Sequence, residues 1–354
     1  MEKYGIILPE TQLPIFIIGA GGIVRDAHLP AYQLVDFPVM GIFDLDQQKS
    51  IVLQKNSNIG SVYQSIGEMV DAAGIDCIYD VAVPGSAVLS VLEQLPDRSN
   101  VLIQKPMGEH LYQAKQILEL CETKQLCAGI NLQLRYAPFI NEARKMIDEG
   151  EIGELTDIEI NVNVFTPWHL WDFLFSAERV EILYHSIHYV DLVRSFLGNP
   201  QSVFAKTTKH PKMKELASVR TNMILDYGEM VRANILTNHA HDFGLENQQS
   251  YIKFEGTEGA IKVEFGVLKN YPKGEPDHFQ YVKAEEGKSP KWKSKPINGT
   301  WFPHAFIGSM AQVMRAATGE IQQPDNSVQD CIHTMAAVEA AYQSSEQGGV
   351  RPSY

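Results

Sequence analysis

The first part of the chain alternates short apolar runs with amphipathic segments. The runs are rich in β-branched residues, so each suits a strand that is buried on both faces. We predict strands at 15–18, 38–43, 76–83, 100–104 and 126–130, with a short one at 61–63. Helical segments separate them: one containing 23–31, one ending near residue 55, and others at 66–73, 87–95 and 111–123. This alternation predicts a doubly wound parallel α/β sheet.

The pattern changes near residue 130. Between 156 and 165, apolar and polar residues alternate strictly, which is typical of a half-exposed strand in an antiparallel sheet. We predict further strands at 203–208, 219–226, 230–237, 251–255 and 260–265, and helices at 140–149, 305–317 and 327–347. The polar stretch 266–303 is expected to be a long, partly mobile connection. The domain boundaries that follow are 1–130 and 131–354, and the C-terminal helices could pack back on the first domain.

Composition excludes several classes of protein. The 354 residues suffice for two domains, and the net charge of −13 argues against a general affinity for nucleic acid or an anionic membrane. No apolar run is long enough to span a bilayer. The four cysteines form no C-x-x-C pair, so we expect neither a zinc framework nor disulfides, and we predict a cytoplasmic location.

The strongest local motif follows the first predicted strand. Gly19, Gly21 and Gly22 form a glycine turn between a strand and a helix, and Val24 stands at the usual third glycine position. Such a turn lets a dinucleotide approach the backbone, beside the positive end of the helix dipole. By itself the motif is weak, because glycine turns also occur in sheets that bind no nucleotide.

An acidic residue strengthens this interpretation. Asp44 ends the second predicted strand, close to the offset at which an acid binds the adenosine ribose hydroxyls. Its charge would repel a 2′-phosphate, so we expect NAD rather than NADP as the cofactor. The alternative is a simple helix cap. Pro84 and Lys105 also follow predicted strands, and ligands of such sheets bind beyond the carboxyl ends of the strands.

Four motifs together resemble the Gfo/Idh/MocA oxidoreductases, the family of inositol dehydrogenase and glucose–fructose oxidoreductase. They are the segment 19–30, the tripeptide 104–106, the segment 135–138 with 150–154 after it, and the segment 188–191 followed by Leu197-Gly198. The resemblance implies a Rossmann domain and a C-terminal α+β domain with an open, mostly antiparallel sheet. It also implies homodimers or homotetramers formed through that sheet.

The resemblance also implies site residues. Lys105 and His188 would be catalytic, with Lys105 stabilising the developing alkoxide and His188 acting as the base. Cofactor contacts would come from the glycine turn, Asp44 and Lys105, and also from Ile23, Val83, Pro84 and Gln104. Arg135 and His185 are candidate substrate ligands. Trp168 and His169 suggest an aromatic wall for a sugar, although tryptophans packed at a domain seam are nearly as plausible.

Three positions depart from the family pattern. Gln104 replaces a glutamate, Val88 stands where a histidine is common, and Tyr184 replaces the aspartate four residues before His188. Tyr184 could therefore donate the proton itself or simply line the pocket. His185 and His188 have a spacing that metal ligands sometimes show, but no third ligand is evident in the sequence, so we expect no metal.

The function that follows is an NAD-dependent dehydrogenase acting on a sugar, a polyol or a related cyclic alcohol. Two alternatives stay open: a non-catalytic sensor that binds the dinucleotide, and a glycoside hydrolase that uses NAD transiently. The presence of both Lys105 and His188 argues against a sensor.

Overall fold

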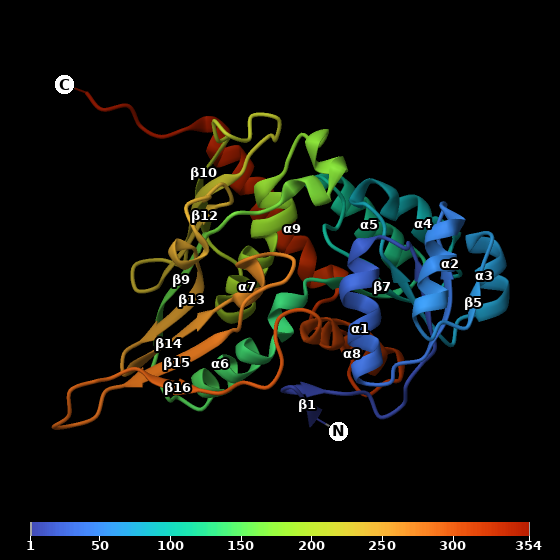
Figure 1. Cartoon of the computed structure of the whole chain (residues 1–354), viewed down its shortest axis with the longest axis horizontal. Coiled ribbons are helices and arrows are strands. Elements are labelled where there is room, and N and C mark those ends of the chain that lie inside the picture. Colours follow the sequence, from blue (N-terminus) through green and yellow to red (C-terminus); the bar gives the residue numbers. More distant parts are fainter. Residues whose placement is uncertain (1, 354) are drawn as a thin grey trace. The chain divides into compact units, whose positions relative to one another are not determined.

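The computed structural model describes residues 2–353, and the chain divides into two units (Figure 1). The first unit contains the residues up to Pro138 together with Trp301–Met335. The second contains Phe139–Thr300 together with the residues from Ala336 onward. The chain therefore returns to the first unit after most of the second has been built.

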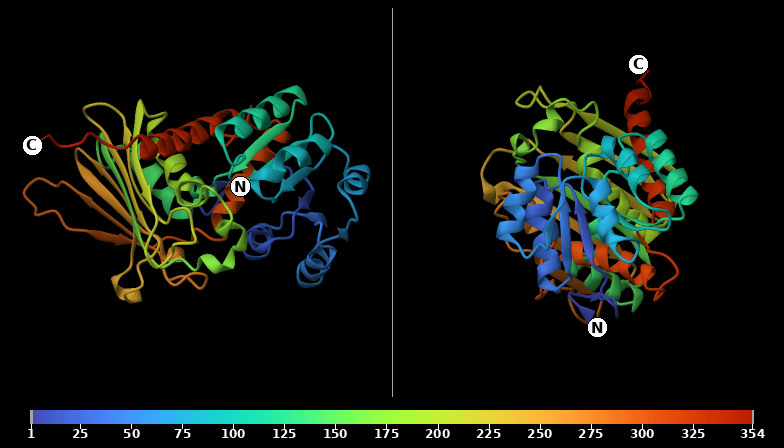
Figure 2. Two further views of the ribbon diagram at one scale, coloured as in Figure 1. Left: turned by 90° about the horizontal axis from the view of Figure 1, so that it is seen from above. Right: turned by 90° about the vertical axis from the view of Figure 1, so that its right-hand side faces the viewer.

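The first unit is built on six parallel strands with helices on both faces (Figure 2, right). In spatial order the strands are β5 (Ser61–Val62), β4 (Val39–Phe43), β3 (Ile15–Ile18), β6 (Ile78–Val81), β7 (Asn100–Gln104) and β8 (Cys127–Asn131). Its helices include η1 (Val24–His28), α1 (Leu29–Leu34), α2 (Gln47–Asn56), α3 (Ile66–Ala73), α4 (Val88–Gln94), α5 (Leu111–Thr123) and α8 (His304–Ala317). The predicted Rossmann sheet is thus confirmed.

The core of this unit explains why α8 belongs to it. Apolar side chains of β3, such as the fully buried Ile15 and Ile17, pack with residues of α1 and with Phe306 and Met310 of α8. Burying such side chains stabilises a fold by about 1.5–3 kcal/mol each. Helix α8 therefore covers apolar sheet surface that would otherwise face water.

The second unit is built on an eight-stranded sheet. In spatial order its strands are β10 (Ser202–Thr208), β11 (Arg220–Asp226), β12 (Arg232–Asn238), β9 (Leu155–Asn163), β13 (Gln249–Gly256), β14 (Gly259–Glu264), β15 (His278–Lys283) and β16 (Lys293–Lys295). All neighbouring strands are antiparallel except β12 and β9. Helical segments of this unit include α6 (Pro138–Asp148), η6 (Glu181–Ser186), α7 (Ile187–Leu197) and most of α9 (Val328–Gln347).

The alternation seen in the sequence sets the two faces of this sheet. On β9, Ile158, Ile160 and Val162 are fully buried, whereas Asp157 and Glu159 on the opposite face are only partly buried. The α7 helix contacts the sheet at β12.

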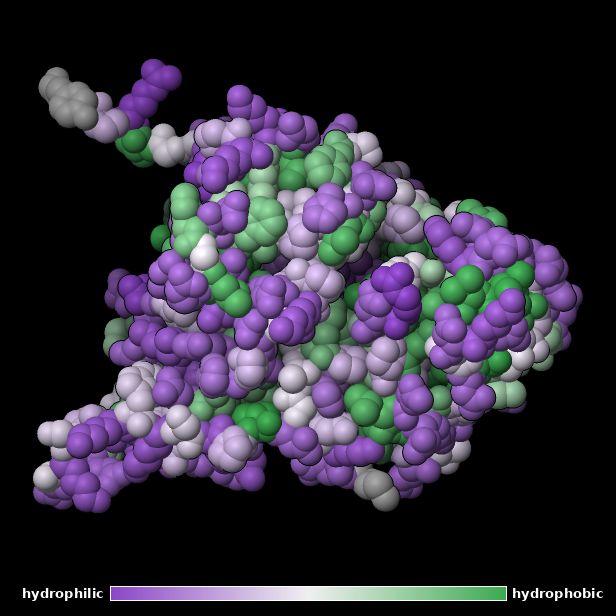
Figure 3. Space-filling model, in the orientation of Figure 1, coloured by the Kyte–Doolittle hydropathy of each residue, from purple (hydrophilic) through white to green (hydrophobic). Residues whose placement is uncertain are grey.

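The prediction for 266–303 is wrong in part. This stretch contains β15 and β16, which extend the sheet at its edge and carry the hydrophilic hairpin at the lower left of Figure 3. Charged residues dominate β16, so it lacks the apolar alternation that marks a strand in sequence. Within residues 2–353, we find no helix with both the length and the apolar character needed to cross a membrane.

Candidate active site

The glycine turn follows β3 and is held tightly against the sheet. Gly19 has a φ of +111°, and a Cβ added to it would lie 2.3 Å from the carbonyl oxygen of Ala82. At Gly21 the opposite holds, because an added Cβ would meet nothing within 4 Å. The helical backbone begins directly after this open space, with the N–H of Val24 bonded to the Gly21 carbonyl at 3.1 Å. The turn therefore has the room and the helix dipole that a pyrophosphate needs.

Asp44 lies directly beyond β4 and is bonded to this turn. Its Oδ2 accepts a hydrogen bond from the backbone N–H of Ala20 at 2.7 Å, and its Oδ1 accepts one from the N–H of Asp46 at 2.7 Å. The carboxylate is thereby fixed beside the glycine turn, where an acid can bind ribose hydroxyls. The residue that caps the next helix, α2, is Asp46, because its Oδ1 accepts a hydrogen bond from the N–H of Gln48 at 3.1 Å.

Lys105 follows the last residue of β7. Its backbone N–H donates to the side-chain Oε1 of Gln104 at 2.8 Å, and its peptide bond to Pro106 is cis. Burial lowers the pKa of the Lys105 ammonium to about 8. Lys105 is therefore mainly a cationic donor at neutral pH, and it loses its proton only slightly above that pH.

The strand order brings the candidate cofactor residues to one edge. β4, β3, β6 and β7 are neighbours, and parallel strands share one carboxyl edge. Asp44, Gly19, Val83-Pro84 and Lys105 follow these four strands in that order, and Gln104 is the last residue of β7. Ile23 precedes η1 and packs partly against the core.

A buried polar network lies behind this edge, and the sequence analysis missed it. His28 Nδ1 lies 2.7 Å from Asp80 Oδ2, and the hydroxyl of Tyr32 donates to the same oxygen at 2.7 Å. His28 Nε2 faces the amide nitrogens of Gln104 at 3.5 Å and Asn131 at 3.2 Å. In this arrangement Nε2 faces two amide donors and Nδ1 faces the Asp80 carboxylate oxygen.

The network connects three strands to the helix that follows the glycine turn. Asp80, Gln104 and Asn131 come from β6, β7 and β8, and Gln104 also binds the backbone of Lys105. Burial, together with the neighbouring Asp80 carboxylate, raises the pKa of Tyr32, so its hydroxyl stays a donor. The signal in the sequence was Asp80 itself, a carboxylate inside an otherwise apolar strand.

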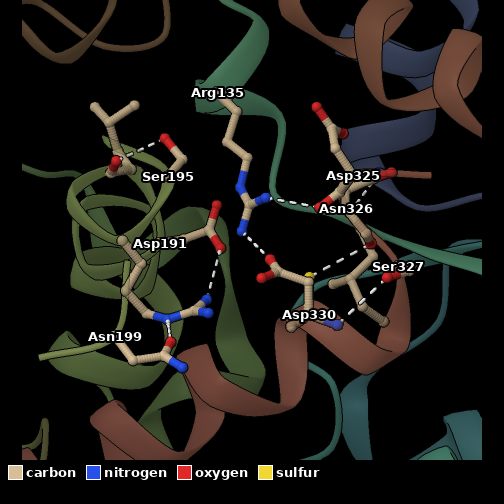
Figure 4. A network of polar contacts seen from close by, with 12 residues as sticks. Arg135, Asp191, Ser195, Asn199, Asp325, Asn326, Ser327 and Asp330 are labelled. Carbon is tan, nitrogen blue, oxygen red and sulfur yellow. Dashed lines mark hydrogen bonds and ion pairs between the residues drawn. The ribbon is translucent and has the colours of Figure 1, made fainter. Parts of the chain in front are cut away.

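His188 and Asp191 lie on α7 in the second unit. Both are buried, and the carboxylate of Asp191 lies 3.9 Å from the guanidinium of Arg194 (Figure 4). Arg194 also donates to the side chain of Asn199 at 2.9 Å. Asp191 therefore balances the charge of a buried arginine.

Arg135 belongs to the first unit and has acidic partners of its own. Its guanidinium donates to Asp330 at 2.5 Å and to the backbone carbonyl of Asp325 at 2.9 Å (Figure 4). The hydroxyl of Tyr136 binds the Asp325 carboxylate. These contacts secure the start of α9, and the role of Arg135 in substrate binding stays a prediction.

The remaining substrate candidates surround a small apolar cluster of the second unit. Trp168 is buried in it, and its ring lies edge-on to those of His185 and His239, with centroids 6.1 and 5.3 Å away. Tyr184 is partly buried against the same cluster and packs on Phe173. His169 is exposed. Trp168 is thus a core residue of this unit, and the proposed aromatic wall stays a prediction.

Comparison with known proteins decides the family. Residues 13–132 match the oxidoreductase family with the NAD-binding Rossmann fold, and residues 140–262 match the GFO/IDH/MocA C-terminal domain. The chain belongs to the Gfo/Idh/MocA oxidoreductase family. It is therefore an oxidoreductase with an NAD-binding domain, as the sequence motifs predicted.

Some relatives match nearly the whole chain, and others match only a part of it. It is 22% identical to the D-apiose dehydrogenase of Rhizobium rhizogenes over 96% of both proteins. It is 29% identical to the glucose-6-phosphate 3-dehydrogenase of Bacillus subtilis over 42% of this chain and 41% of that protein. An oxidoreductase from Agrobacterium radiobacter, solved with NAD⁺, L-tartaric acid and magnesium, shares the fold. Its TM-score is 0.79 at 20% identity, with 96% of this chain and 98% of that one covered.

Proposed function

We propose that the protein is an NAD-dependent dehydrogenase that oxidises a CH–OH group of a sugar, a polyol or a related cyclic alcohol. The observation that carries this proposal is the carboxyl edge of the parallel sheet, where the glycine turn, Asp44 and Lys105 follow neighbouring strands. The names of the relatives support the substrate class, since two of them act on sugars or sugar phosphates.

The residues of the first unit fit the cofactor. The open space at Gly21 accommodates the pyrophosphate, and the Asp44 carboxylate, fixed by two backbone N–H groups, receives the ribose hydroxyls. NAD, when bound, accepts the hydride of the carbinol carbon. A 2′-phosphate at Asp44 would bring two negative charges together, so NAD is preferred to NADP.

Lys105 stabilises the oxygen of the substrate. Its ammonium donates a hydrogen bond to the reacting hydroxyl and favours the alkoxide that forms there. His188 is the proposed base that takes the hydroxyl proton, because a histidine changes charge near neutral pH. Tyr184 is the second candidate for this proton transfer.

The protein is proposed to form a homodimer or homotetramer through the sheet of the second unit. Phe204, Ile224 and Leu236, on β10, β11 and β12, are 58%, 51% and 39% exposed. Phe204 and Ile224 are paired in register. Exposed apolar side chains grouped on one sheet face are typical of an interface.

The proposal is tested with a panel of sugars, polyols and cyclic alcohols, read at the absorbance of NADH. Steady NADH formation with one of them is the expected result. Tight NAD binding without turnover on any member would favour a sensor instead. Cleavage of nitrophenyl glycosides without net NADH would favour an NAD-assisted hydrolase.

A further inference from the structure

A second chemically unusual cluster lies in the second unit. Glu181, His185 and His239 each offer one ligand atom, and these atoms lie within 4.8 Å of one another. Glu181 and His185 belong to η6, whereas His239 directly follows β12, 58 residues after Glu181. The fold therefore supplies the third ligand that is not evident beside His185 in the sequence.

The distances suit a cation of the zinc class. His239 Nε2 and Glu181 Oε1 are 3.3 Å apart. Two ligands of a tetrahedral zinc ion, each about 2.0–2.2 Å from the metal, are about 3.3–3.5 Å from each other. The imidazole rings of His185 and His239 are also close, with centroids 4.1 Å apart. Imidazole ligands favour zinc over magnesium.

Side chains around the cluster make hydrogen bonds to its members, as residues around a metal site commonly do with the metal ligands. The other ring nitrogen of His239, Nδ1, lies 2.8 Å from the Thr166 hydroxyl, an orienting contact that metal-binding histidines usually make. The Glu181 carboxylate accepts hydrogen bonds from Ser186 at 2.7 Å and from Thr221. These contacts hold the ligand side chains in place before any cation arrives.

Glu181 is fully buried, and its carboxylate oxygens face the side chains of His239, Ser186 and Thr221. A buried carboxylate needs a compensating positive charge. Either a protonated histidine or a metal ion supplies it.

We propose that Glu181, His185 and His239 bind a divalent cation of the zinc class. Three protein ligands of the type His₂Glu leave the fourth position for water or for an oxygen of a bound molecule, which is the pattern of zinc sites that keep an open position. His185 is partly buried, whereas Glu181 and His239 are buried. The proposal does not depend on dehydrogenase activity, because binding is measured directly.

The test is the metal content of the full-length protein and its titration with ZnCl₂ and CoCl₂. We expect close to one equivalent of zinc after dialysis, a Co²⁺ absorption spectrum of tetrahedral type, and a lower Tm after chelation. Glu181→Gln and His185→Gln should each weaken Zn²⁺ binding by at least about tenfold. Thr166→Val should weaken it by about 10–100-fold, because it removes an orienting contact.

The matched control is His241→Gln. His241 lies two positions after His239 and is partly buried, but its Nδ1 contacts the side-chain amide of Asn163 at 3.1 Å, outside the cluster. This variant should bind zinc like the unaltered protein. Less than about 0.1 equivalent of zinc in the reconstituted protein would overturn the proposal and assign the positive charge to a protonated histidine. Equal zinc affinities of the His185→Gln and His241→Gln variants would also overturn the proposal.

Discussion

Among single residues, Asp44 gives the most specific prediction about the cofactor. Asp44→Ser removes the charge that repels a 2′-phosphate, so the preference for NAD over NADP should fall by more than tenfold, or about 1.4 kcal/mol. Dissociation constants for both dinucleotides measure it. Asp46→Ser is the matched control, because Asp46 caps α2 without binding the glycine turn. Equal affinity of the unaltered protein for NAD and NADP would refute the assignment.

Lys105 should set an alkaline limit on the rate. Since burial lowers its pKa to about 8, the ammonium is present below that pH and is lost as the pH rises through it. Oxidation should therefore decline above about pH 8, and Lys105→Arg, which keeps its charge, should move this decline upward.

Lys105→Ala separates catalysis from cofactor binding. It should remove most turnover and leave NAD affinity within a few-fold, because the reacting oxygen is the proposed partner of the ammonium. The opposite result, lost NAD affinity with the rate retained at saturating cofactor, would give Lys105 a different role.

The proton acceptor is identified by two variants assayed on one substrate. His188→Asn should reduce the rate by about 10²–10⁴-fold, the span for a lost general base. Tyr184→Phe keeps the packing on Phe173 and should cost much less if Tyr184 only lines the pocket. If Tyr184→Phe is the more damaging and abolishes the pH dependence, Tyr184 transfers the proton and His188 supports it.

For whole elements, the turn between β3 and η1 gives a pair of matched glycine substitutions. Gly19→Ala places a Cβ against the Ala82 carbonyl at a positive φ, so both Tm and NAD affinity should fall. Gly21→Ala meets no protein atom and should leave Tm nearly unchanged while weakening NAD binding. Thermal unfolding and NAD titration of the two variants measure this contrast. A normal NAD affinity for Gly21→Ala would place the pyrophosphate elsewhere.

These elements also show what a sequence can predict. The parallel sheet, the glycine turn and the position of Asp44 beyond β4 were predictable, because each depends on local periodicity and on residues at strand ends. The pairing of Asp80 with His28 was not, since the two are 52 residues apart and nothing local identifies the partner. The same holds for Glu181 and His239. Strand β16 was missed because pairing with β15, rather than apolar alternation, makes it a strand.

For the whole molecule, the motifs predicted the family and the class of reaction, and both are confirmed by the matches to its two domains. The substrate could not be predicted in the same way. The motifs specify backbone turns and charges around the cofactor, and they carry no information about the side chains that select a substrate. Trp168 illustrates this, because a tryptophan beside a histidine gives no local sign that its ring is buried.

The oligomeric state of the whole molecule can be tested with a single substitution. Ile224→Glu places a charge on the exposed face of β11, beside its register partner Phe204, and should shift the proposed oligomer toward monomer because burying that charge is costly. Val52→Glu is the control, since Val52 lies on α2 of the first unit and is 52% exposed, close to the 51% of Ile224. Light scattering after size exclusion measures the mass of each variant. We expect a lower mass for the Ile224→Glu variant and an unchanged mass for Val52→Glu. An unchanged oligomer in Ile224→Glu would show that the interface lies on another face. A monomeric unaltered protein would contradict the proposed oligomer itself.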